Sequence, residues 1–185
     1  MQIDIRDNLS DVLVGLDAIE TKVLPKATDR SLNRVGKRAS RLMMRQIGKE
    51  AGVAQKVLKN RGFFASAKSS IRTLTFTVIV KWGAIPLKDF NPRQTKKGVT
   101  AKAWGSRQVY DGAFIVDKLG RHVFVRKTKK RLPIKKLYGP IPARLAEGEA
   151  VEREINNMLA ESIPKEMLSN IKFYASKELR RVMRG

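Results

Sequence analysis

Cysteine is absent from this chain, and histidine occurs only once, as His122. Without cysteine the chain cannot build a disulfide scaffold, a thiol nucleophile or a zinc site with thiolate ligands. Long hydrophobic runs are also missing, because no apolar stretch approaches the roughly 18 residues that span a bilayer. The first residues, MQIDIRDNLSDV, carry acids where a signal peptide has a basic end and then an apolar run. We therefore expect a cytoplasmic protein with no membrane contact.

Groups that support catalysis are scarce as well. A general base needs an orienting partner, and the sequence offers no obvious partner for His122. Residues 51–145 contain only three acids, Asp89, Asp111 and Asp117, whereas a metal-dependent nuclease needs several carboxylates that converge on its ions. The glycine patterns of phosphate loops, dinucleotide-binding folds and nucleophile elbows are absent. We predict no enzyme activity, no metal site and no cofactor.

Positive charge is abundant and unevenly distributed. The chain carries 39 lysines and arginines against 17 acids, a net charge of +22. Residues 51–145 hold 22 basic and 3 acidic side chains, a net charge of +19, whereas residues 1–50 have a net charge of +3 and residues 146–185 are neutral. Such self-repulsion destabilises a compact state, so it indicates a partner of opposite charge.

The two ends of the chain have the periodicity of amphipathic helices. Pro25 predicts a break or a new helix start, and Ser162 with Pro164 predicts a kink or a restart. On α5-like residues near the C-terminus the apolar stripe is Leu168, Ile171, Ala175, Leu179 and Val182. The expected helical segments are 9–23, 28–49, 53–59 and 143–185.

The middle of the chain has strand patterns. In residues 70–82 one alternating set of side chains forms the better core face, namely Arg72, Leu74, Phe76, Val78, Val80 and Trp82. Residues 84–90 are expected to pair back with it, 99–105 reads as a weaker strand, and Lys118-Leu119-Gly120 joins an antiparallel hairpin. These patterns predict an α+β fold, an antiparallel sheet core with amphipathic N-terminal and C-terminal helices. We expect a single domain over 1–185, helical over 1–60 and 143–185, with a basic β module over 62–138.

Two cationic elements stand out in this β module. The segment RKTKKRLPIKK, residues 126–136, has seven basic side chains in eleven positions. Each element is read either as a solvated loop or as a contact for nucleic-acid phosphates or an acidic protein. Phe90, Trp104 and Tyr110 are near these loops and could stack on bases, although such aromatics more often anchor a loop to a core. The candidate binding residues are Arg93, Lys96, Lys97, Lys102, Arg107, Arg126, Lys127, Lys129, Lys130, Arg131, Lys135 and Lys136.

A family resemblance covers the same block. The segments WGAIPLKDFNPRQTKKGVTAKAWG (82–105), YDGAFIV (110–116) and LGRHVFVRKTKKRLPIKKLYGPIP (119–142) resemble the minor tail protein Z family of tailed bacteriophages and prophages. The order of elements matches: Ile-Pro-Leu, a lysine-rich loop, Phe-Ile-Val, a glycine-turn hairpin, then Lys-Lys-Leu-Tyr-Gly-Pro. One departure is that Gly139-Pro140 runs straight into Ile141, where the family often has a small polar residue.

The resemblance implies a structural virion protein with a tail-completion-like fold and no catalytic residues. Such proteins act late in tail assembly, at the head-proximal end of a long non-contractile tail, where the tail joins the head. The implied partners are other tail and head–tail connector proteins, with double-stranded DNA and a homo-oligomeric ring as further expectations. The implied locations are the virion tail and, during assembly, the host cytoplasm. The alternative is a free-standing basic, non-sequence-specific nucleic-acid-binding protein, against which the near-neutral terminal helices argue; a nuclease ranks third.

Overall fold

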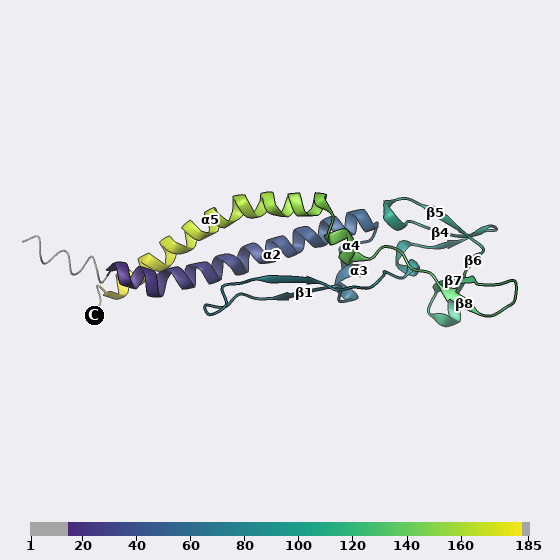
Figure 1. Ribbon diagram of the computed structural model, residues 1–185, viewed down its shortest axis with the longest axis horizontal. Coiled ribbons are helices and arrows are strands. Elements are labelled where there is room, and N and C mark those ends of the chain that lie inside the picture. Colours follow the sequence, from purple (N-terminus) through teal and green to yellow (C-terminus); the bar gives the residue numbers. More distant parts are fainter. Residues whose placement is uncertain (1–14, 183–185) are drawn as a thin grey trace, which may run out of the picture. The chain divides into compact units, whose positions relative to one another are not determined.

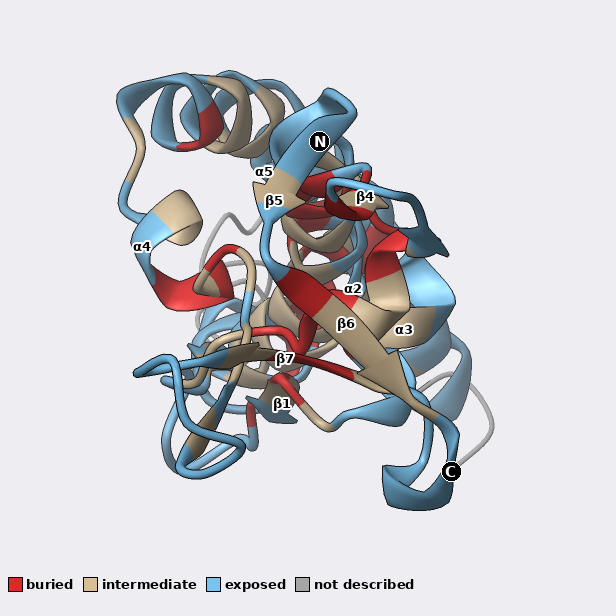
Figure 2. Ribbon diagram, turned by 90° about the vertical axis from the view of Figure 1, so that its right-hand side faces the viewer, coloured by how far each residue is buried: buried red, intermediate tan, exposed pale blue. Residues whose placement is uncertain are grey.

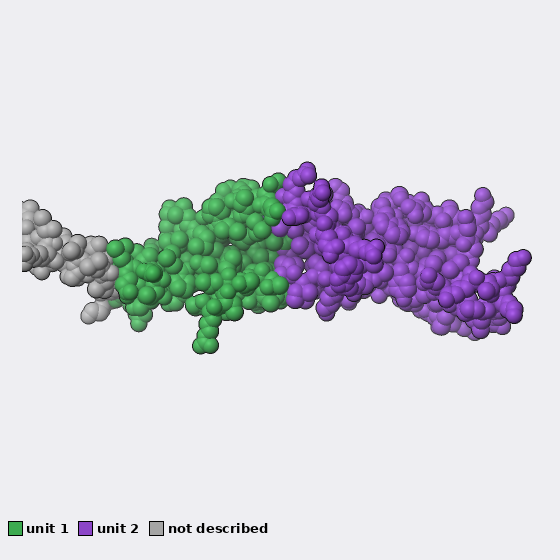
Figure 3. Space-filling view, viewed as in Figure 1, with its two compact units in different colours: residues 1–39, 66–77, 156–185 green, residues 40–65, 78–155 purple. Residues whose placement is uncertain are grey.

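The computed structural model describes residues 15–182 and combines helices with antiparallel strands (Figure 1). This confirms the predicted α+β class, with helices towards both ends of the chain. The chain divides into two compact units, coloured separately in Figure 3. Unit 1 comprises residues 1–39, 66–77 and 156–185, and unit 2 comprises residues 40–65 and 78–155. We describe each unit by itself, and the single-domain organisation stays a prediction.

The predicted helix break at Pro25 is wrong. Helical structure begins at Gly15 and continues through η1 (Ile19–Val23) into α2 (Leu24–Ala51). The η1 turn is a π-helical turn, in which the Leu24 N–H donates to the Ile19 carbonyl. Proline lacks an N–H and crowds the carbonyl four residues earlier, and a widened turn immediately before it accommodates both effects. Residues 9–14 of the predicted helix lie outside the described residues.

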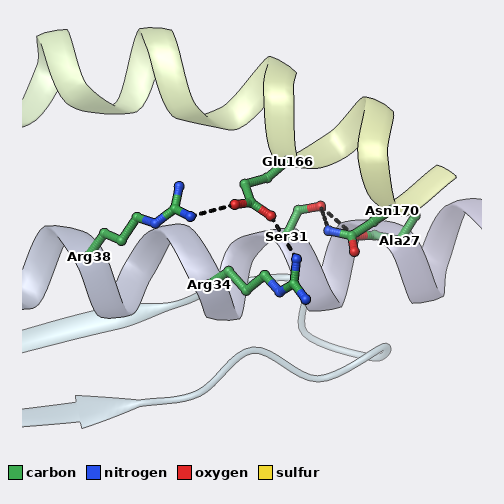
Figure 4. Close-up of polar contacts among 6 residues, drawn as sticks. All are labelled: Ala27, Ser31, Arg34, Arg38, Glu166 and Asn170. Carbon is green, nitrogen blue, oxygen red and sulfur yellow. Dashed lines mark hydrogen bonds and ion pairs between the residues drawn. The ribbon is translucent and has the colours of Figure 1, made fainter. Parts of the chain in front are cut away.

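In unit 1, α5 (Glu149–Val182) meets α2 through polar side chains (Figure 4). Asn170 is 2% exposed and donates a hydrogen bond of 2.8 Å to the Ser31 hydroxyl. Ser31 is equally buried and donates in turn to the Ala27 carbonyl at 2.7 Å. Both buried polar groups are therefore satisfied, which removes the cost of burying them without partners.

A charged contact lies one turn away on the same two helices (Figure 4). The buried carboxylate of Glu166 accepts hydrogen bonds from Arg34 at 3.1 Å and from Arg38 at 2.7 Å. The Arg34 hydrogen bond and the Arg38 charge lower the pKa of Glu166, against the effect of burial, which raises it. We call these contacts, from Ser31–Asn170 to Arg34, Arg38 and Glu166, the polar seam.

The polar seam corrects the predicted apolar stripe of α5. Leu168 and Leu179 are exposed, while Ile171 and Ala175 are only half-buried. The side chain of Val182 lies outside the described residues. The stripe was assigned on the assumption that the apolar face turns inward, but Ser31, Arg34 and Arg38 on α2 offer hydrogen bonds, so a polar face of α5 turns inward instead. No second helix starts at Ser162 or Pro164, since α5 continues through both.

The predicted strand over residues 70–82 is wrong for its first part. Residues 70–73 form a turn, and the backbone at Leu74 has a left-handed φ of 44°. Only β2 (Thr77–Val80) is a strand, and it pairs with β1 (Phe64–Ala67), which was not predicted. In this segment Phe76, Val78 and Val80 are partly buried, as predicted, whereas Arg72, Leu74 and Trp82 are exposed.

Unit 2 contains two three-stranded antiparallel sheets. The first has the order β3 (Arg93–Gln94), β4 (Gly98–Ala101), β5 (Gln108–Asp111), and the second has the order β6 (Ala113–Val116), β7 (His122–Arg126), β8 (Ile134–Lys136). The predicted hairpin is confirmed as β6–β7, with Phe114 opposite Phe124 and a turn that ends at Gly120, whose φ is 68°. The weaker strand predicted at 99–105 ends at Ala101 and gives way to η3 (Ala103–Gly105).

Residues 84–90 do not pair back with β2, which corrects another expectation. The Ile85 N–H donates to the Pro140 carbonyl at 3.0 Å, and the Gly139 N–H donates to the Ile85 carbonyl at 2.7 Å. The chain then turns through η2 (Leu87–Phe90). Gly139 permits this approach, because a Cβ there would lie 2.6 Å from the Phe90 ring.

One apolar cluster holds both sheets of unit 2 against the helices α2, α3 (Gln55–Asn60) and α4 (Pro142–Ala146). Its central members are fully buried (Figure 2). They are Ile47, Leu58, Ile85, Leu87, Phe90, Val99 and Val123. Each such side chain contributes about 1.5–3 kcal/mol when it is removed from water.

The end of α2 is fixed against the first sheet, as the glycines there predict. The Val53 N–H donates to the Gly48 carbonyl at 2.9 Å and the Gly52 N–H to the Lys49 carbonyl at 3.3 Å, the hydrogen bonds of a Schellman motif. Gly52 has a φ of 78°, and a Cβ there would lie 2.6 Å from the Gly105 nitrogen. This close approach positions η3 and the loop that carries Lys102.

The polar seam predicts acid-sensitive stability that depends on Glu166. Its pKa is lowered from 4.5 in the folded chain, so its contribution is complete above that value and is lost as the pH falls through the lowered pKa. Glu166→Gln should therefore reduce the free energy of unfolding by about 1–2 kcal/mol at neutral pH. The difference from the unmodified chain should shrink towards zero near pH 3.

Urea denaturation at both pH values measures this difference. Glu161→Gln is the matched control, because that exposed residue pairs only with Lys165, four residues along the same helix. An equal loss from both variants, or a Glu166→Gln loss that persists in acid, would contradict the role of the seam.

Candidate nucleic-acid interface

The first cationic element lies on the β3–β4–β5 sheet. Lys96 and Lys97 occupy the tip of the β3–β4 turn, which Thr95 and Gly98 close with backbone hydrogen bonds of 2.7 and 3.3 Å. Both lysine side chains are exposed. The turn is supported from behind, because the Lys97 carbonyl accepts the Gly112 N–H at 3.0 Å.

Two arginines of this element approach the same strand position. Arg93 on β3 pairs with Thr100 on β4 in the sheet register. The Arg107 guanidinium donates to the Thr100 hydroxyl at 3.1 Å. Lys102 follows β4 and is also exposed. The sheet therefore presents the five predicted cations of this element to solvent.

The second element is the loop between β7 and β8. Its two ends are joined where the Lys127 N–H donates to the Pro133 carbonyl at 3.2 Å, and every residue from 126 to 133 is exposed. At the loop's base the Arg126 guanidinium lies 5.2 Å from the centre of the Phe114 ring, a cation–π distance that holds the arginine at the sheet surface. Lys135 is exposed, whereas Lys136 is half-buried.

The cations of both elements have no carboxylate partners. Within residues 15–182, none of the twelve candidate side chains forms a salt bridge. Strands β4 and β6 are in contact, so the two elements belong to adjoining sheets. Eleven of the twelve side chains are exposed, and we call the twelve together the cationic surface. An uncompensated surface of this kind attracts polyanions and gives no means of reading a sequence.

The aromatic candidates separate in the structure. Phe90 is buried in the apolar cluster. Tyr110 is half-buried with its hydroxyl enclosed, and burial raises the pKa of that hydroxyl. Trp104 alone among the three is exposed, at 49%, and its backbone has a left-handed φ of 53°. Base stacking by Phe90 or Tyr110 is therefore excluded by their burial, and Trp104 is the remaining candidate.

His122 does not have the surroundings of a general base. Lys136 Nζ donates to His122 Nε2 at 3.1 Å, so the proton of the neutral ring is on Nδ1. Nδ1 is enclosed, and in the described part of the chain it has no hydrogen-bond partner. Burial lowers the pKa of His122, as do the charges of Lys136, Lys88 and Arg61. The ring is therefore held neutral and lacks an orienting carboxylate.

Metal and membrane sites are not found in residues 15–182. No group of three or more acids, histidines or cysteines there is arranged to hold a metal ion. None of the helices described is long and apolar enough to cross a bilayer.

Comparison with known proteins identifies the family. A family model described as prophage minor tail protein Z matches residues 8–184. The chain belongs to this family. No curated protein and no solved structure matches it.

Membership gives the chain a structural role in a phage tail, with other phage proteins as its partners. It confirms the resemblance found in residues 82–142. The match also extends over both helical ends, which have no signature of their own. One cationic feature of those helical ends was missed. It lies in unit 1, where acids elsewhere on the same helices hide it from a count of charge along the sequence.

The state of His122 provides a test of the non-catalytic interpretation. Because the folded-state pKa is lowered, we expect its NMR titration midpoint below the ordinary value of 6.5. Lys136→Met should move that midpoint upward, because it removes a positive charge and the donor to Nε2. As His122 is the single histidine, the signal needs no assignment. A midpoint above 6.5 in the unmodified chain would reveal an anionic partner and reopen the question of catalysis.

Proposed function

We propose that this minor tail protein is a tail completion protein. It acts late in assembly, at the head-proximal end of the tail, where the tail joins the filled head. Family membership supports the tail role, and the cationic surface supports a position next to the genome. Several copies arranged as a ring would present that surface repeatedly to one DNA end. Assembly takes place in the bacterial host cytoplasm.

The observation that carries this proposal is the cationic surface without carboxylate partners within residues 15–182. Two acids close to it are engaged elsewhere, since Asp89 pairs with Arg61 and Asp117 with Arg121 at 3.5 Å. The cations of the surface are therefore available to external phosphates. Contact with phosphates through lysine and arginine is independent of sequence and falls steeply with salt. A protein that holds a genome end and later releases it needs contact of this reversible kind.

The main rival within the same role is docking on acidic surfaces of neighbouring tail or neck proteins. Complementary charge steers protein partners as well as DNA. The loop from 127 to 133 is long enough and exposed enough for either partner. A DNA-binding measurement separates the two.

Catalysis has no part in the proposal. The family is structural, and within residues 15–182 the only histidine lacks an orienting partner. The proposed contact needs neither a cofactor nor a metal ion, because lysine and arginine side chains neutralise phosphates directly.

The test is charge reversal at the tips of both loops. The variant Lys96→Glu, Lys97→Glu, Lys129→Glu and Lys130→Glu should weaken binding to a short DNA duplex by at least about tenfold. It should also flatten the dependence of binding on salt by roughly 3 to 4 phosphate contacts. Fluorescence anisotropy of a labelled duplex over roughly 50 to 200 mM salt measures both quantities.

The matched control reverses four exposed lysines of unit 2 outside the cationic surface: Lys49, Lys56, Lys59 and Lys81. It has the same net charge as the test variant. If salt-sensitive binding survives in the test variant, or falls equally in both, the cationic surface does not hold DNA at these loops. Docking on acidic proteins would then be the better account.

A further inference from the structure

A groove of about 1370 Å³ lies in unit 1, away from the residues of the cationic surface. It is formed by the start of the α2 helical segment and the last turns of α5. Its lining residues are Lys22, Val23, Lys26, Ser169, Lys172, Phe173, Tyr174, Ser176, Lys177, Glu178, Arg180 and Arg181.

The groove is strongly cationic. Six lysines and arginines line it against one carboxylate, Glu178, which lies 3.9 Å from Lys22. The other five cations form no salt bridge with any residue from 15 to 182. Residues 146–185 are neutral as a whole, but their acids fall mostly in the first half of α5 and their cations in its last turns. Helix pairing concentrates the cations at one end.

The groove also has an apolar part. Val23 is buried at its base, and the Phe173 ring is 51% exposed. The Arg30 guanidinium lies 4.9 Å from the centre of the Phe173 ring and 6.0 Å from that of Tyr174, which fixes the ring positions. A ligand that suits these walls has carboxylates and apolar side chains together. Duplex DNA offers phosphates but keeps its bases stacked inside, so it leaves Phe173 unmatched.

The chain itself contains a segment of this chemistry. Residues 1–14, MQIDIRDNLSDVLV, have three acids, Asp4, Asp7 and Asp11, against one cation, Arg6. The acids are spaced by three and four residues, the spacing that places side chains on one helix face. Apolar residues fill most of the remaining positions. This segment and the groove are therefore complementary in both charge and hydrophobicity.

The geometry of α2 favours a second copy as the source of the segment. Lys22 follows Gly15 by seven residues in continuous helical structure, about 10 Å along the axis. A segment attached before Gly15 would have to reverse its direction to reach the groove of its own copy. A segment from a second copy has no such restriction.

We propose that residues 1–14 of one copy bind in the basic groove of a second copy. Each copy then has one acidic donor segment and one basic acceptor groove, a head-to-tail arrangement that closes into a ring when its rotation permits. This inference rests on the self-association contained in the proposed function. It does not depend on DNA binding by unit 2.

The absence of cysteine from the chain makes a direct test possible. Asp7→Cys in one preparation and Lys177→Cys in a second, size-tagged preparation are mixed and oxidised mildly. The disulfide-linked heterodimer should exceed either homodimer by about tenfold on a non-reducing gel. The matched control replaces the acceptor variant by Lys118→Cys, an exposed lysine of unit 2, and should give no such excess.

Charge reversal tests the chemistry of the contact. Lys172→Glu with Arg181→Glu in the acceptor should abolish the excess, and Asp4→Lys with Asp11→Lys in the donor should restore it. Restoration shows that the acceptor variant is folded, so a loss of cross-linking is attributable to charge. Circular dichroism melting curves of each variant provide an independent check of folding.

The proposal is overturned if the heterodimer does not exceed the control, or if charge reversal leaves it unchanged. It is also overturned if a chain with both cysteines cross-links only within itself, since the segment then occupies the groove of its own copy. Weaker duplex binding by the acceptor variant, without any heterodimer, would assign the groove to nucleic acid instead. Oligomers that form without this cross-link would overturn the groove proposal and leave the proposed function standing.

Discussion

The two three-stranded sheets of unit 2 have strands of two to five residues and depend for their stability on one shared apolar cluster. Sheets this small need a packed face to persist in water. Ile47 from α2, Leu58 from α3 and Phe90 from η2 provide it, and they meet Val99 and Val123 on the two sheets. Because the apolar side chains are drawn inward, the cations of the connecting loops face solvent. The cluster therefore maintains a surface whose self-repulsion works against folding.

Unit 1 is held together by a different interaction. Its helices meet through the polar seam, and apolar side chains such as Leu168, Phe173 and Leu179 stay exposed. A seam of satisfied hydrogen bonds specifies which residues face each other more than it adds stability. The exposed apolar side chains and the cationic groove are what an assembly protein needs if its surfaces are completed by other chains. Both units thus have surface features that a solitary protein would not require.

The sequence predicted those elements whose signals are local. The β6–β7 hairpin follows from its glycine turn, and the end of α2 follows from Gly52. Pairing between distant segments was not predictable, so the contact of Ile85 with Pro140 was missed. The alternation in residues 70–82 suits a strand, but a turn at 70–73 interrupts it. At the candidate site the exposure of the loop cations was predictable from their polarity. The burial of Phe90 and Tyr110, and the groove of unit 1, depend on tertiary packing that periodicity does not encode.

The central claim is that this basic chain is an assembling tail component whose contact with nucleic acid is weak and electrostatic. Light scattering, with and without a DNA duplex and at low and moderate salt, tests it most directly. The account predicts particles of several copies, with DNA association at low salt that moderate salt removes. A monomer that binds DNA or RNA tightly at moderate salt would contradict the account, because nucleic acid rather than the phage tail would then be its main partner.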